Sequence, residues 1–123
     1  MIQGQFGEDD ELFFEIELIA GDGLEIVTEA MLDTGFSGWL AIDNQDIVGF
    51  DWVYVRREAM RMAQGGDSTF NLYIGKVRID GQEFDIPVHA GDGVPEILIG
   101  RKWLRNRQLL VDIESGVLTL GKN

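Results

Sequence analysis

Apolar and polar side chains alternate along much of this chain with the two-residue period of half-buried β-strands. In residues 12–19, Phe14, Ile16 and Leu18 alternate with Glu15 and Glu17. A turn at residues 20–23 and an apolar stretch at 24–32 complete a predicted hairpin. The same patterns predict further strands at residues 1–6 (weakly), 39–42, 52–57 with an extended continuation to 62, 68–80, 83–90, 96–100, 108–113 and 116–120.

Helical signals are few. Asp43 is a suitable N-cap for one or two helical turns at residues 43–48, and residues 101–107 form the one clear short helix. About nine short strands beside so little helix predict a single, mostly β domain over residues 1–123, either a barrel or a sandwich.

Composition narrows the function classes. The 123 residues include no cysteine, which excludes disulfides and thiolate chemistry, and no apolar run long enough to span a bilayer. A polar, acidic start at residues 1–10 does not resemble a signal peptide, so we expect a cytoplasmic protein. The net charge of −12 argues against nucleic-acid and anionic-membrane partners.

One short segment carries candidate chemistry. A predicted buried strand runs into Asp33-Thr34-Gly35, where a carboxylate, a hydroxyl and a turn-forming glycine follow one another. A carboxylate at the end of a buried strand is costly unless it has a use, and a pair of such carboxylates can share one proton. Because Asp and Gly also favour ordinary turns, the tripeptide alone leaves a plain turn as the alternative.

The order of motifs resembles retropepsin-like aspartic proteases, and the form that begins at Asp33 looks like small bacterial and archaeal members. Leu32-Asp33-Thr34-Gly35 comes first, then a glycine-tipped hairpin, then Ile97-Leu98-Ile99-Gly100-Arg101 before a short helix, with Asp33 and Gly100 67 residues apart. The resemblance covers residues 11–120. It implies a closed β barrel with a flap hairpin and a short C-terminal helix.

The resemblance also implies a function. It describes a homodimeric aspartic endopeptidase in which Asp33 of two copies activates water to hydrolyse an extended peptide or protein substrate, with no metal or other cofactor. Thr34 would bond across the dimer and Gly35 would bond the substrate backbone. The hairpin at 59–70 would be the flap, with Gln64, Gly65 and Gly66 at its substrate-binding tip.

The chain departs from the retroviral pattern next to the motif. Phe36 replaces a small residue, so its ring would narrow a substrate subsite or enter the dimer contact. Ser37 replaces an acid, so Arg101, another expected substrate-binding residue, needs a different partner. Residues 1–6 and 118–123 are candidates for an interchain sheet. The alternative function is a dimerisation or peptide-binding module with the same fold and without significant hydrolysis.

The remaining candidates have ordinary structural interpretations. Leu32, Val53, Ile97 and the three tryptophans are expected in the core, and the single histidine, His89, as a satisfied strand residue rather than a metal ligand. Basic residues gather at 56–61 and 101–107, which solvated faces explain, with an anion site as the alternative. Ala-Gly-Asp-Gly occurs at 20–23 and again at 90–93, each time followed by an apolar strand, a glycine and a Trp-Leu pair, as in a pseudo-symmetric fold.

Overall fold

The computed structural model describes residues 1–61 and 66–121, and strands dominate it. The expected residues 64 and 65 of the flap tip lie outside these ranges. In chain order the elements are β1 (Ile2–Gln3), β2 (Gln5–Phe6), β3 (Leu12–Ile19), β4 (Glu25–Asp33), β5 (Leu40–Asp43), α1 (Asn44–Ile47), β6 (Val53–Arg61), β7 (Asp67–Ile79), β8 (Gln82–Gly91), β9 (Leu98–Gly100), the 3₁₀ helix η1 (Arg101–Leu104), β10 (Gln108–Asp112) and β11 (Val117–Gly121).

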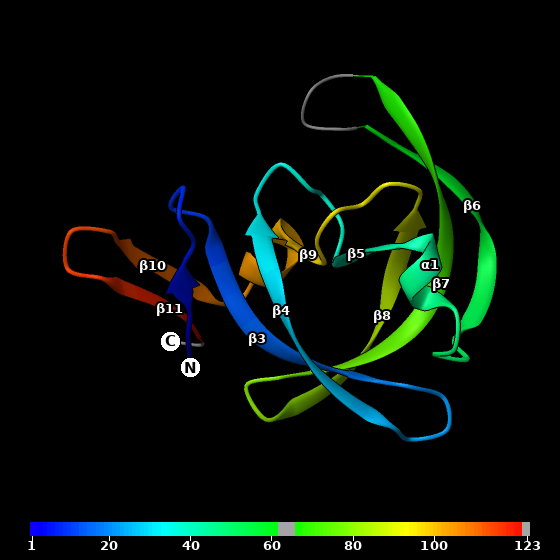
Figure 1. Ribbon diagram of the computed structural model, residues 1–123, viewed down its shortest axis with the longest axis horizontal. Helices are drawn as coiled ribbons and strands as arrows, with labels where there is room; N and C mark the ends of the chain where they lie inside the picture. Colours follow the sequence, from blue (N-terminus) through cyan, green and yellow to red (C-terminus); the bar gives the residue numbers. More distant parts are fainter. Residues whose placement is uncertain (62–65, 122–123) are drawn as a thin grey trace.

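Six strands close into a barrel, as expected (Figure 1). The sheet runs β3-β4-β9-β5-β8-β7, and β7 pairs back onto β3 through Leu18 and Val77 to complete the ring. β4 with β9 and β5 with β8 are parallel pairs, whereas the hairpins β3–β4 and β7–β8 are antiparallel. Asp80 and Gly81 connect β7 and β8 with positive φ angles of 54° and 75°, the conformation of a type I′ hairpin turn.

The barrel interior holds the alternating apolar positions of these strands. In β3 the side chains of Phe14, Ile16 and Leu18 are each 1% exposed, which confirms the face predicted from the alternation. Trp103 of η1 belongs to the core and is fully buried, whereas Trp39 and Trp52 are partly buried and pack against the core. Val53 was predicted in the core and is 68% exposed, because it pairs with Ile74 on the outer face of the β6–β7 hairpin.

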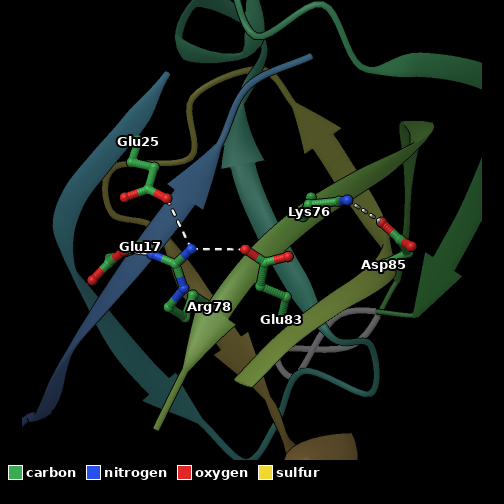
Figure 2. A network of polar contacts seen from close by, with 6 residues as sticks. All are labelled: Glu17, Glu25, Lys76, Arg78, Glu83 and Asp85. Carbon is green, nitrogen blue, oxygen red and sulfur yellow. Dashed lines mark hydrogen bonds and ion pairs between the residues drawn. The ribbon is translucent and has the colours of Figure 1, made fainter. Parts of the chain in front are cut away.

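An arginine spans the seam of the barrel. Arg78 of β7 donates to Glu17 of β3, to Glu25 of β4 at 2.8 Å and to Glu83 of β8 at 2.7 Å (Figure 2). The hydrogen bond and charge of Arg78 lower the pKa of Glu25, and the three carboxylates raise the pKa of Arg78. One guanidinium therefore connects four barrel strands where the sheet closes.

A second, three-stranded sheet is built from the chain ends. β1 pairs with β11 through Ile2 and Leu120, and β11 pairs with β10. The terminal strands that were candidates for an interchain sheet thus pair within one chain. The β10–β11 hairpin projects from the barrel (Figure 1) and exposes the apolar side chains of Leu110, Val111 and Ile113.

The helices are shorter than the pattern suggested. Asp43 caps α1 by accepting a hydrogen bond from the Gln45 amide at 3.0 Å, as expected for an N-cap. The predicted helix at 101–107 is a single 3₁₀ turn, because the chain enters β10 at Gln108. In the described ranges, no helix has the length and apolar character needed to cross a membrane.

Candidate active site

β4 delivers Asp33 to one end of the barrel, where the chain turns sharply. The amide of Gly35 donates to Oδ1 of Asp33 at 2.8 Å, and the amide of Phe36 donates to the Asp33 carbonyl at 3.1 Å. Asp33 is half-buried and Thr34 is exposed, so the carboxylate has a fixed orientation yet stays near solvent. Oδ2 has no recorded partner in the described chain, which leaves it available to a water molecule or a second acid.

The loop after Asp33 is held from behind by β9 and η1. Gly100 donates its amide to the Trp39 carbonyl, and Arg101 donates its amide to the Phe36 carbonyl, each at 3.0 Å. A Cβ atom on Gly100 would lie 2.0 Å from the carbonyl oxygen of Gly38. Only glycine permits this backbone approach, which is the close packing expected at this position.

Arg101 binds a backbone carbonyl in place of the acidic partner that this sequence lacks. Its Nη1 donates to the carbonyl of Thr34 at 3.3 Å, so the guanidinium braces the backbone of the Asp33 loop instead of pairing with a neighbouring acid. The side chain remains exposed, and its other N–H groups have no acceptor among the described residues. Ser37 lies half-buried in the same loop.

Phe36 occupies the interior. Its side chain is 8% exposed, and its ring packs edge-on against His89 with 5.9 Å between centroids. The ring also fills the space next to Gly38 and Gly100, where a Cβ would come within 2.9 Å of it. In the single chain, Phe36 therefore has a packing role, and its expected contact with a substrate or with the dimer partner stays a prediction.

The hairpin expected to be the flap is present. β6 and β7 pair from Val53 with Ile74 out to Arg61 with Asp67, and their far ends rise at the barrel end where β4 finishes (Figure 1). Gly66 adopts a φ of +78° with open space around its Cα, as a turn residue at an exposed tip requires. Gln64 and Gly65 lie outside the described residues.

A hollow of about 370 Å³ lies between this hairpin and the Asp33 loop. Arg56, Glu58 and Met60 of β6 form one wall, and Ser37, His89 and Lys102 contribute to the others. It has the position and size of a side-chain subsite for a strand-like peptide lying between hairpin and barrel. The described residues contain no group of three His, Asp or Glu side chains that could hold a metal ion.

His89 is the residue that sequence reasoning underrated. It is 4% exposed on β8, and its ring lies between the edges of Phe36 and Phe70. Nε2 lies 3.2 Å from Glu58 Oε1, but Nδ1 is buried and has no partner among the described residues, so the expectation of a satisfied histidine holds for one nitrogen only. The sequence signal was a single histidine within an alternating apolar stretch. The contact of His89 with Glu58 of β6 has no signal in the sequence.

Comparison with known proteins supports the architecture. The chain matches a crystal structure of a retropepsin-like aspartic protease from Rickettsia conorii with a TM-score of 0.64, over 98% of this chain and 88% of that one. This chain has the retropepsin fold. The sequence identity is 20%, and no protein-family model and no curated protein matches the sequence. The likeness therefore concerns the fold of the chain.

Proposed function

We propose that this chain is an aspartic endopeptidase that acts as a homodimer. The observation that carries the proposal is the Asp33 loop: a carboxylate oriented by the Gly35 amide, backed by β9 through Gly100, at the end of a retropepsin barrel under the β6–β7 hairpin. The part of the chain that the structure describes contains one such loop, so a catalytic pair would require a second copy related by a two-fold axis near Asp33.

The chemistry follows from two carboxylates at one site. Because two adjacent negative charges repel, the pair keeps one shared proton at pH values at which two isolated carboxyls would both be ionised. The ionised Asp33 takes a proton from a bound water, and the protonated Asp33 of the second copy donates to the peptide carbonyl. Water then attacks, and the tetrahedral intermediate forms without a covalent bond to the enzyme.

The surface supports association of two copies. Leu110, Val111 and Ile113 on the projecting β10–β11 hairpin are 52%, 41% and 52% exposed, and β10 has a free edge in the described part of the sheet. Exposed apolar side chains next to a free strand edge favour contact with another chain. The charge of −12 per chain opposes association, so we expect the dimer to be more stable at moderate salt than at very low salt.

The experiment compares wild type with Asp33→Asn on a complex mixture of unstructured peptides from pH 3 to pH 7.5. Asp46→Asn is the matched control, because Asp46 is an exposed acid in the first turn of α1. We expect wild type and the control to cut the same bonds and Asp33→Asn to lose at least about 1,000-fold in kcat/KM, as removal of an essential catalytic group does.

Sedimentation measurements accompany the cleavage assay. If Asp33→Asn cuts as fast as wild type, Asp33 is not the catalytic group. If neither cuts while both are folded dimers, the protein is a peptide-binding or dimerisation module with this fold. If wild type cuts as a monomer at all concentrations, the shared-site dimer is wrong.

A further inference from the structure

The surface beside the Asp33 loop is positive although the protein is strongly acidic. The hollow under β6 adjoins a second hollow of about 520 Å³ beside η1, and both are lined by Ser37 and Lys102. Arg56 lines the first hollow, and Arg101 and Arg105 line the second. Four of the ten lysines and arginines therefore surround two adjoining hollows in a chain whose net charge is −12.

Three of these four cations lack an ion pair in the described part of the chain. Among the described residues, Glu58 is the one carboxylate that lines either hollow, and it already contacts Arg56 at 3.1 Å and His89. In the part of the chain that the structure describes, no ion pair within 4.0 Å involves Arg101, Lys102 or Arg105. Arg78 on the far part of the barrel, by contrast, has three glutamates. The charge beside the active site is thus left for something outside the chain.

We propose that these two hollows select substrates in which an Asp or Glu side chain lies to one side of the bond to be cleaved. The inference rests on the proposed peptidase function and adds the substrate class to it. An extended peptide between hairpin and barrel presents alternate side chains to the same wall, so one of them reaches the hollows next to the Asp33 loop. A carboxylate there meets Lys102 as a point charge and the forked donors of Arg101 or Arg105.

The geometry favours a peptide as the source of this carboxylate. Arg101 is tied to the Thr34 carbonyl, which fixes its guanidinium at the edge of the catalytic loop. Arg56 lies on β6, the strand that would cover a bound peptide. The rest of the protein surface is acidic and repels an acidic peptide. A preference for a carboxylate at one peptide position would therefore come from these cations and not from the net charge of the protein.

The test measures binding, so that it does not depend on hydrolysis. Asp33→Asn protein is titrated into fluorescent ten-residue peptide pools with Glu, Gln or Lys fixed at each position in turn and the other positions randomised. We expect the pool with Glu to bind about fivefold more tightly than the pool with Gln at one peptide position, or at two positions on the same face of the extended peptide. The difference should be smaller at 300 mM than at 50 mM salt.

Charge reversal then assigns the preference. Lys102→Glu/Arg105→Glu in the Asp33→Asn background should favour Lys over Glu at that same position. Lys76→Glu/Arg57→Glu makes the same change in net charge at two cations that line neither hollow, and should keep the preference for Glu. If the reversed variant does not fold, Lys102→Gln/Arg105→Gln replaces it and should abolish the difference between Glu and Gln.

Three results overturn the inference. Equal affinity for Glu and Gln at every position shows that the cations do not select. Failure of every pool to bind shows that no peptide site exists under these conditions. Loss of the dimer in the Lys102/Arg105 variants, with the dimer intact in the control, shows that these cations pair with carboxylates of a second copy. Absence of cleavage by wild type with a retained preference for Glu refutes the peptidase, not the selection.

Discussion

Replacing Gly100 by alanine tests the claim that the Asp33 loop is held by close backbone contact. The added Cβ would lie 2.0 Å from the Gly38 carbonyl oxygen and 2.8 Å from the Gly38 carbonyl carbon. Ordinary contact begins at 3.4 Å, so the loop would have to retreat by about 1.4 Å. Gly100 itself has φ −94° and ψ 175°, which alanine adopts easily, so the loss comes from the clash and not from backbone strain.

The magnitude depends on how freely the loop can move. β9 and β4 are paired through Gly100 and Asp33, and the Gly100 amide is bonded to the Trp39 carbonyl. Since the obstacle is backbone and not the end of a flexible side chain, we expect the upper part of the range for overpacking, a loss of about 3 kcal/mol in the free energy of unfolding. Cleavage should also fall, because Asp33 moves with the loop.

Gly116→Ala is the matched control for this change. Gly116 has a φ of +70° and no atom within 4 Å of a built Cβ, so alanine there meets backbone strain without a clash. We expect a loss of about 1 kcal/mol and unchanged cleavage. Urea unfolding of both variants measures the difference. If Gly100→Ala loses no more stability than Gly116→Ala, the loop yields easily and the close contact does not hold it.

Two further predictions concern the barrel. Arg78→Gln should lower the midpoint of thermal unfolding at pH 7 and make that midpoint fall less steeply in acid. Arg78 lowers the pKa of Glu25 from 4.5, so the stabilisation is present above about pH 4.5 and is lost as the pH falls through the lowered pKa. If the midpoints of wild type and variant fall in parallel between pH 3 and pH 7, the prediction is wrong. Trp103→Ala should cost about 3–5 kcal/mol in urea unfolding, because it leaves a cavity in place of a fully buried side chain. Trp103→Phe should cost clearly less, because a ring still fills most of that space and the Trp39 carbonyl, which loses the indole donor, keeps its bond from Gly100. Equal losses would refute that account.

Much of the barrel could be predicted because strand alternation is a local signal. The apolar face of β3 and the Asp80-Gly81 turn each depend on a few adjacent residues, and both are as expected. Contacts between distant segments have no such signal. The register that turns Val53 outward and the Glu58–His89 contact follow from how β6 pairs with β7 and β7 with β8, which no local pattern encodes.

Charge illustrates the same limit. The clusters at 56–61 and 101–107 were visible in the sequence, where solvated faces were an adequate explanation. What the sequence did not show is that β6 and η1 approach the Asp33 loop from two sides, so that Arg56 and Lys102 line one hollow. Nor did it show that the Phe36 side chain turns inward and packs against His89.

In the proposed function, one chain supplies one carboxylate of a pair, and the packing beside Asp33 bears on where the other can come from. The two copies of the internal repeat meet each other: Trp39 and Trp103 pack edge-on with 4.9 Å between centroids, and Trp103 Nε1 donates to the Trp39 carbonyl at 2.9 Å. In the parallel pairing of β4 with β9, the residue beside Asp33 is Gly100. The position that pairs with Asp33 is thus a glycine, and its close approach to the Gly38 carbonyl leaves no room for a side chain there. A second acid at this position would be excluded by the same 2.0 Å approach, so the partner carboxylate that the proposed chemistry requires has to come from another copy.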